Sequence, residues 1–273
     1  MSYVCPECQE ARVEYVGMSD DAKTLLRCGL CEHEWAHGGE RPVPRTAAMT
    51  YEQAKSTFPR ASDVTPAATK RFRALTAEFL QLHPDPEPGV AEFWARYQHL
   101  FSAEGLPGAP PAELKLLANT ETGAHPGNMS VFNRAWNEQG DEAAAEQFRG
   151  VVEYLLRGPA DVPLEDRLTR LIDPEDPIGM TGFRESLLSK VLCIMDPTKF
   201  LPILIYTSPA GGKREIARSV FGLELPAPER TSMTRGRLAC WSNDLLVECL
   251  DGTFPTLAQA AWFLWWAKEQ PAS

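Results

Sequence analysis

Four cysteines near the N-terminus constrain the fold of this chain more than any other feature. Cys5 and Cys8 form one Cys-x-x-Cys pair, Cys28 and Cys31 form a second, and nineteen residues separate the two pairs. This spacing is typical of a four-cysteine zinc site, in which two tight knuckles direct four thiolates at one ion in a tetrahedron. The segment is too small to build an apolar core, so we expect the metal to supply most of its folding free energy.

Two alternatives to a four-cysteine zinc site are weaker. A redox-active Cys-x-x-Cys pair would need a surrounding βαβ pattern, which this segment lacks. His33 and His37 are metal-ligating residue types, but four well-spaced thiols leave no position for them. The sequence therefore predicts a ribbon around one structural zinc ion over residues 1–40, with hairpin strands near 12–16 and 24–26. What the ribbon contacts stays open, because zinc ribbons bind DNA, RNA and proteins.

Beyond the ribbon, the sequence has the periodicity of a helical protein. Thr65 followed by Pro66 is a typical helix start, because threonine can cap free N–H groups and proline is tolerated at the first helical position. Apolar residues recur at helical spacing, and proline or glycine clusters separate the periodic runs. Residues 200–206 are apolar and mostly β-formers, so a strand is expected there. Helices are expected at residues 51–58, 66–82, 90–101, 112–118, 129–136, 142–156, 164–171, 182–195, 212–221, 238–250 and 256–268.

These patterns predict a mainly α fold of the α+β class. A small β zinc ribbon at residues 1–40 is followed by a linker with a short helix at residues 41–62. Residues 63–273 form a mostly helical domain with one or two short strands. The linker is placed where two prolines occur within a short polar stretch.

The composition favours a globular protein without a membrane span. Apolar residues make up 44% of the chain and charged residues 23%, and the richest apolar run, residues 258–267, is too short to cross a bilayer. Cys5 lies where the apolar core of a signal peptide would be. We therefore expect a soluble, cytoplasmic protein. Three further cysteines lie singly in apolar surroundings and are expected to be buried: Cys193, Cys240 and Cys249.

Little in the sequence points to catalysis. Gly211-Gly212-Lys213 resembles part of a phosphate loop, but the earlier glycine and the Ser or Thr after the lysine are missing. Glycines at a helix start can still bind an anion through free N–H groups, and a simple turn is the alternative. No serine lies in a nucleophile elbow, and no acidic cluster with a nearby lysine is evident. We expect no catalytic activity, although a nuclease built from scattered residues stays an alternative.

Positive charge is concentrated in one part of an acidic chain. The formal net charge is -10, but residues 181–237 carry +4 and the remainder carries -14. A local basic face is the minimum electrostatic requirement for binding a phosphate backbone. An ordinary solvated surface is the alternative. The candidate DNA face consists of Lys190, Lys199, Tyr206, Lys213, Arg214 and Arg218.

Three segments resemble one family of proteins. Residues 182–203 read GFRESLLSKVLCIMDPTKFLPI, residues 127–133 read GNMSVFN, and residues 263–266 read FLWW. Together they resemble the N-terminal specificity region of McrB-like restriction AAA+ proteins, which are modified-DNA-dependent ATPases and GTPases. The resemblance covers about residues 113–268. The motor domain of that family is absent from this sequence, and the zinc ribbon is an addition to the family pattern.

The resemblance implies a sensor of foreign or modified double-stranded DNA that works with a motor ATPase or GTPase and a nuclease. The first functional hypothesis is therefore a DNA-binding specificity module of a bacterial restriction or anti-phage defence system. The second is a protein–protein interaction scaffold with a structural zinc ribbon, which the net charge of -10 favours. The third is a nuclease with an unrecognised site.

Overall fold

The computed structural model describes residues 13–18, 24–28, 31, 34–37, 48–173, 176–208 and 211–271. The chain divides into two compact units, Met1–Ala47 and Ala48–Ser273. The second unit, called the helical unit below, accounts for most of the chain. The fold is mostly helical, as the sequence predicts.

The described part of the N-terminal unit is a small antiparallel sheet with the strand order β1-β2-β3. Its strands are β1 (Val13–Met18), β2 (Thr24–Cys28) and β3 (Glu34–His37). The first two correspond to the predicted hairpin, and β3 extends the sheet on the other side of β2. Strand β2 ends at Cys28, the first cysteine of the second Cys-x-x-Cys pair.

Eleven α-helices are described in the helical unit, and each lies where the periodicity predicts one. Their bounds are α1 (Tyr51–Thr57), α2 (Pro66–Leu82), α3 (Val90–Leu100), α4 (Pro111–Asn119), α5 (Ser130–Gln139), α6 (Asp141–Arg157), α7 (Leu164–Ile172), α8 (Glu185–Met195), α9 (Lys213–Phe221), α10 (Arg235–Leu250) and α11 (Leu257–Lys268). The predicted start of α2 is confirmed, because the Thr65 side chain accepts the N–H of Ala68 at 3.2 Å and Pro66 is the first helical residue.

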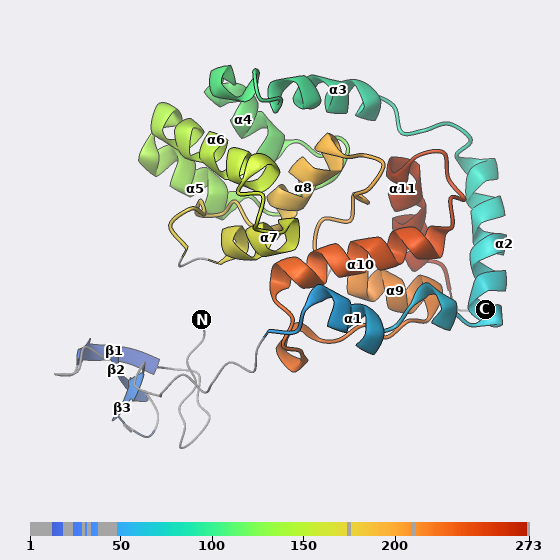
Figure 1. The fold of residues 1–273 in the computed structure, drawn as a ribbon, viewed down its shortest axis with the longest axis horizontal. Coiled ribbons are helices and arrows are strands. Elements are labelled where there is room, and N and C mark those ends of the chain that lie inside the picture. The colour runs from blue at the N-terminus through green and yellow to red at the C-terminus, as the bar shows by residue number, and fades with distance from the viewer. Residues whose placement is uncertain are drawn as a thin grey trace. The chain divides into compact units, whose positions relative to one another are not determined.

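Two apolar clusters fill the helical unit, and α10 lies between them (Figure 1). One cluster is built mainly by α3 to α8, and its centre contains Phe148 stacked on Phe183 with ring centroids 4.5 Å apart. The other is built by α1, α2, α9 and α11 together with one side of α10. Phe263 of α11 is fully buried in this second cluster, where it packs on Phe72 and Phe79. Neighbouring residues of α10 contribute to different clusters, so this helix joins the two halves of the unit.

A glycine allows α7 and α10 to pack closely. A Cβ atom on Gly236 would lie 2.2 Å from the Glu165 carbonyl oxygen and 2.4 Å from the Thr169 nitrogen. These are backbone atoms of α7, which cannot move aside as a flexible side chain could. Beside this contact, the Thr169 and Thr234 hydroxyls share a hydrogen bond of 2.7 Å. The close approach of the two helices therefore requires glycine at position 236.

Residues 48–62, which the sequence places in a linker, pack on the helical unit instead. The Arg237 guanidinium forms a bidentate ion pair with Asp166 and also donates to the Met49 carbonyl oxygen at 2.8 Å. The Tyr51 hydroxyl donates to the Asp244 carboxylate, and the Phe58 ring lies 5.2 Å from that of Trp241. This segment, including α1, is thus fixed to α10 through polar and apolar contacts.

Residues 200–206 do not form the predicted strand. The segment is buried but irregular, and the described residues offer it no neighbouring strand. Its polar backbone groups are satisfied in other ways: the side-chain oxygen of Asn243 accepts the Leu201 N–H at 2.9 Å. The carbonyl oxygens of Ile205 and Tyr206 accept the first two N–H groups of α9. The β-forming residues are explained by burial alone, because they supply side chains to both apolar clusters.

Across the part of the chain that the structure describes, every helix is too short or too polar to cross a lipid bilayer.

Candidate functional site

The structure divides the predicted DNA face into buried and exposed residues. Lys190, Lys213 and Tyr206 have only 1%, 3% and 3% of their surfaces exposed. Lys199 and Arg218 are exposed, and Arg214 is half-buried. The first three side chains are not available to a phosphate backbone in this structure. The six residues therefore do not form one continuous surface.

Lys190 lies inside the protein at one side of α8. Its ammonium donates to the Thr120 carbonyl oxygen at 2.5 Å and lies 5.5 Å from the centre of the Phe93 ring. Burial lowers the pKa of this lysine to about 8, against the smaller opposing influence of Cys193 and Glu121. Lys190 therefore fixes the loop that begins at Thr120 to α8.

The start of α9 does not offer the anion site that its glycines suggested. The N–H of Lys213 donates to the Ile205 carbonyl oxygen at 3.0 Å, and that of Arg214 donates to the Tyr206 carbonyl oxygen at 2.9 Å. A Cβ atom on Gly212 would lie 2.7 Å from the same Ile205 oxygen, so glycine is needed for this close turn. The glycine-led helix start is therefore a packed turn, which was the alternative interpretation of the motif.

Tyr206 is a core residue that closes the same turn. Its hydroxyl donates to the Pro226 carbonyl oxygen at 2.7 Å, and its N–H donates to the Glu185 carboxylate at 2.6 Å. Burial raises the pKa of the Tyr206 hydroxyl and also that of the Glu185 carboxyl, while the Lys213 ammonium acts against the rise at Glu185. Neither group of Tyr206 is free to contact a base.

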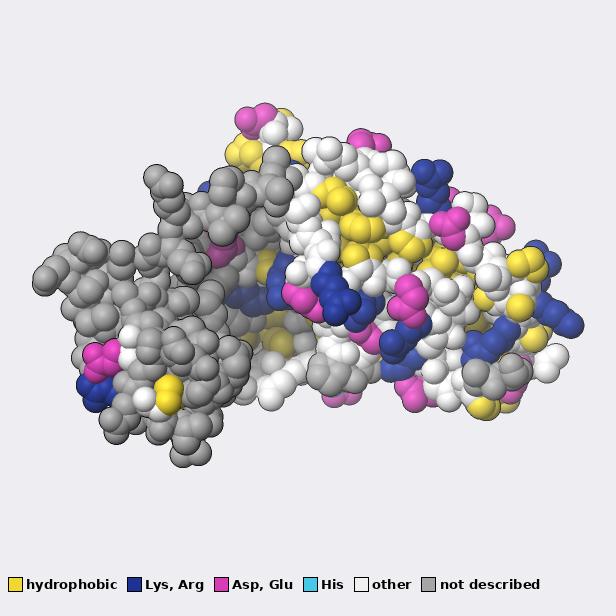
Figure 2. Space-filling model, turned by 90° about the horizontal axis from the view of Figure 1, so that it is seen from below, with side chains coloured by type: hydrophobic (Ala, Val, Ile, Leu, Met, Phe, Trp, Pro, Cys, Tyr) yellow, Lys and Arg dark blue, Asp and Glu magenta, His cyan; other side chains and the backbone are white. Residues whose placement is uncertain are grey.

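Two cations of the predicted DNA face are exposed, Lys199 and Arg218. Lys199 and Arg218 form no ion pair with any residue that the structure describes, whereas the Arg214 guanidinium donates to the Leu225 carbonyl oxygen at 3.1 Å. On the face seen in Figure 2, Lys and Arg side chains alternate with Asp and Glu. That face of the helical unit therefore carries mixed charge, with the cations interrupted by carboxylates.

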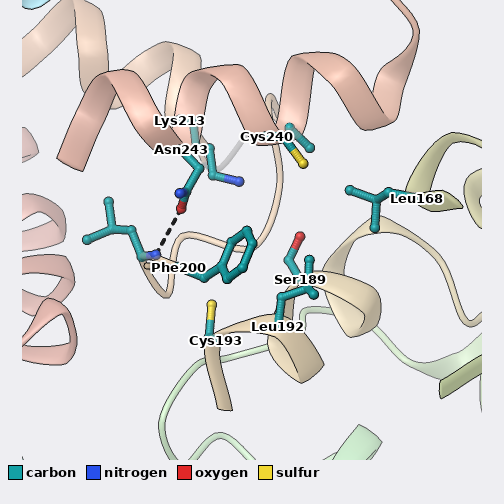
Figure 3. A pocket seen from close by; sticks show the side chains of 10 residues that line it. Leu168, Ser189, Leu192, Cys193, Phe200, Lys213, Cys240 and Asn243 are labelled. Carbon is teal, nitrogen blue, oxygen red and sulfur yellow. Dashed lines mark hydrogen bonds between the residues drawn. The ribbon is translucent and has the colours of Figure 1, made fainter. Parts of the chain in front are cut away.

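A small cavity with a mainly apolar lining lies between α7, α8, α9 and α10. Its volume is about 10 Å³, and all ten residues that line it are buried. Its polar side chains come from three helices: Ser189 and Cys193 of α8, Lys213 of α9, and Cys240 and Asn243 of α10 (Figure 3). Burial raises the pKa of the Cys193 and Cys240 thiols to about 12, while the Lys213 ammonium acts against the rise at both. The two thiols are therefore protonated at neutral pH, as expected for structural cysteines.

The sequence missed this cavity because its residues are far apart in the chain and belong to no known motif. The available signal was the polarity of individual residues within apolar runs. Ser189 interrupts the apolar run of α8, and Asn243 lies within the buried part of α10. Only the packing of the three helices brings these side chains together.

Both cysteines of the second Cys-x-x-Cys pair lie among the described residues. Cys28 is buried, Cys31 is exposed, and the Cys31 N–H donates to the Cys28 sulfur at 3.5 Å. A backbone N–H that donates to a cysteine sulfur three residues earlier is also found in zinc knuckles. Cys5 and Cys8, the other two predicted ligands, lie outside the described residues. Within the described residues, no cluster of three or more His, Cys, Asp and Glu side chains is placed to hold a metal ion.

Two of the segments that resemble McrB-like proteins touch one another, although most of residues 127–133 are exposed or half-buried. Gly182 has a positive φ of 79°, and a Cβ atom there would lie 2.4 Å from the Phe132 nitrogen. Phe132 and Phe183 are both buried, with ring centroids 6.3 Å apart. Phe132, Gly182 and Phe183 therefore occupy packing positions where these two segments meet.

Comparison of the whole chain with known protein families, with curated proteins and with solved structures finds no match.

Proposed function

We propose that this chain is a DNA-binding specificity module of a bacterial restriction or anti-phage defence system, without catalytic activity of its own. It senses foreign or modified double-stranded DNA and works with a motor ATPase or GTPase and a nuclease. The observation that supports this proposal best is the Cys28–Cys31 turn, in which the Cys31 N–H points at the Cys28 sulfur. Such a turn suits a zinc ribbon, and ribbons are common nucleic-acid-binding modules.

The burial pattern redefines which residues of the helical unit are proposed to contact DNA. Of the six candidates, Lys199 and Arg218 are exposed and form no ion pair with a described residue. They are the residues proposed to contact phosphates. Lys213 is unsuitable for a charge-reversal test, because a buried glutamate at this position would perturb folding before it affected binding.

The test is a titration of fluorescent duplexes, plain and base-modified, with the full chain at several salt concentrations. Lys199→Glu combined with Arg218→Glu should lower affinity by about 10-fold or more at low salt. The slope of log affinity against log salt should become shallower by about 1.8, because each phosphate contact contributes about 0.9. Arg218→Glu is matched by Arg134→Glu, a charge reversal of an exposed arginine on α5. The Arg134 variant should bind as the original chain does.

Loss of binding in Cys28→Ser with unchanged binding in the double variant would place the DNA contact in the N-terminal unit. Binding that is equal in all these variants, or absent for every duplex at low salt, would contradict the proposal.

The protein-interaction scaffold is the second candidate, and one observation favours it. The face in Figure 2 carries alternating charges, and the chain as a whole carries -10. Such surfaces repel a phosphate backbone overall and suit protein partners better. The scaffold is the expected conclusion if no duplex binds. A nuclease remains a third candidate, which incubation of supercoiled and linear DNA with magnesium or manganese would test.

A further inference from the structure

The first half of α2 carries positive charge without nearby carboxylates of its own. Lys70, Arg71 and Arg73 lie within four consecutive residues, and residues 64–77 contain no Asp or Glu. The Lys70 and Arg73 side chains are exposed. Neither of them forms a hydrogen bond or an ion pair with the part of the chain that the structure describes. These two cations are therefore available to a partner.

Arg71, the third cation of this group, has a structural role instead. Its guanidinium donates to the Ser219 carbonyl oxygen in the last turn of α9 and to the Gln270 carbonyl oxygen just after α11, both at 3.0 Å. Beside it, the Phe72 ring of α2 lies 5.4 Å from the Phe221 ring that ends α9. These contacts fix the first half of α2 against the end of α9, at one end of the helical unit (Figure 1).

This packing adds a cation from α9 to the same end of the unit. Arg218 is adjacent in the chain to Ser219, is exposed, and forms no ion pair with a described residue. Glu269, which precedes Gln270, is already paired with Lys268 at 3.1 Å. Three exposed cations from two helices thus occur at this end without a carboxylate partner among the described residues. They are called the cationic end below: Lys70, Arg73 and Arg218.

Helix stability does not explain the two cations of α2. Lys70 and Arg73 are three residues apart on one helix, so their charges repel each other. A cation gains from the helix dipole only in the last turn, which is the position of Arg218 in α9 but not of Lys70 and Arg73 in α2. Like charges kept together on an exposed surface suit a polyanion as partner.

The surroundings of the cationic end favour DNA over an anionic membrane. A peripheral membrane surface inserts large apolar side chains beside its cations. Among the described residues, the large apolar side chains that are exposed are Leu82, Leu116 and Val131, and none of them lies within residues 65–77. A DNA duplex needs no such insertion, because it presents one phosphate charge per about 1.7 Å of its axis.

We propose that Lys70 and Arg73 extend the phosphate contact of Arg218 into one surface that binds the backbone of double-stranded DNA. This surface deepens the proposed DNA-binding function and depends on it. Phosphate contacts position a duplex but do not read its bases. The cationic end therefore supplies affinity for any duplex, and recognition of a modified base belongs to another part of the chain.

The test is an anisotropy titration of fluorescent duplexes, plain and base-modified, with the full chain at several salt concentrations. Lys70→Glu combined with Arg73→Glu should lower affinity by about 10-fold or more at low salt, and equally for both duplexes. The slope of log affinity against log salt should become shallower by about 1.8, because each phosphate contact contributes about 0.9. The matched control is Arg134→Glu combined with Arg230→Glu, which makes the same change in net charge at two exposed arginines outside α2 and α9. The control should bind as the original chain does.

Folding of the α2 variant is checked by helical circular dichroism. Its signal and melting temperature should match those of the original chain, because both side chains are exposed and make no hydrogen bond with a described residue. If the charge reversal lowers the melting temperature, Lys70→Gln combined with Arg73→Gln replaces it. That neutral variant should show the same decrease in salt slope.

Duplex binding with unchanged affinity and slope in the α2 variants would overturn this surface and leave the proposed function standing. Equal weakening in the control would show an effect of net charge alone and would overturn it as well. A lack of duplex binding by the original chain would contradict the proposed function itself. If that chain then bound phosphatidylserine vesicles and the α2 variants did not, the surface would belong to a membrane contact, contrary to the proposal.

Discussion

The N-terminal unit and the helical unit of this chain are expected to be stabilised in different ways. The described part of the N-terminal unit is a three-stranded sheet with strands of four to six residues, and its predicted ligands are four thiols. The helical unit contains two large apolar clusters that α10 connects. A small sheet cannot bury enough apolar surface to fold alone, whereas a domain as large as the helical unit can. The comparison indicates that metal should control one unit and side-chain packing the other.

Metal removal should give the largest difference between the units. We expect about one zinc ion per chain by elemental analysis, and its removal by a strong chelator should unfold the N-terminal unit. The helical signal and its melting temperature should stay unchanged, because α1 to α11 contain none of the predicted ligands. Cys28→Ser should reproduce the effect.

Cys249→Ser, which alters a half-buried cysteine of α10, is the matched control and should retain the metal. Hydrogen exchange would report each unit separately. Unchanged protection of β1 to β3 in zinc-free protein would show that packing holds this unit too.

The next largest effect concerns packing in the helical unit. Gly236→Ala should destabilise it by about 1–3 kcal/mol, because the added Cβ would collide with the Glu165 and Thr169 backbone of α7. Gly150→Ala in α6 is the matched control, since a Cβ there meets nothing within 4 Å. It should stabilise the helix by about 0.5–1 kcal/mol. Urea unfolding measures both, and a stabilising effect at both positions would show that α7 and α10 are less tightly packed.

The smallest expected effect is the contribution of the buried Lys190 to the pH dependence of stability, which exposed lysines should not make. The pKa of Lys190 is about 8 in the folded chain, whereas an ordinary solvated lysine, as in the unfolded chain, has a pKa of 10.5. Below pH 8 both states hold the proton, so the folded state bears the full cost of a buried ammonium. Between pH 8 and 10.5 the folded chain releases a proton that the unfolded chain keeps, so the stability contributed by Lys190 rises with pH.

The free energy of unfolding of the original chain, relative to that of Lys190→Met, should therefore increase by about 1–2 kcal/mol between pH 7 and 9.5. One titrating group contributes at most about 1.4 kcal/mol per pH unit. The comparison of two proteins removes the contributions of the cysteines and tyrosines that titrate in the same range. Urea unfolding at several pH values measures the difference. Parallel curves would mean that the Lys190 ammonium is solvated.

The helices were predictable because their signals are local. Thr65 and Pro66 mark the start of α2 through the capping chemistry of neighbouring residues, and His83 ends it just before a proline. The strand prediction at residues 200–206 failed because a strand needs a partner. β-forming residues describe a buried environment but do not specify what lies beside them.

The positions of the lysines could not be predicted from charge. A count of cations along residues 181–237 contains no information on which side of a helix faces the core. All residues from Leu187 to Ile194 are buried, so α8 is surrounded and even Lys190 lies inside. The Cys-x-x-Cys spacing, in contrast, carries its geometry within a few residues. The four-cysteine zinc site at this spacing stays a prediction.

The amide of Asn243 has a consequence for the chemical ageing of the protein. The Asn243 side chain makes hydrogen bonds that a neighbouring strand would otherwise make. Its oxygen accepts the Leu201 N–H, and its NH₂ group donates to the Lys199 carbonyl oxygen. Deamidation would replace the donating end with an oxygen that faces the Lys199 carbonyl oxygen, and two acceptors would then repel each other. Deamidation of this one side chain would thus loosen the packing between the two apolar clusters.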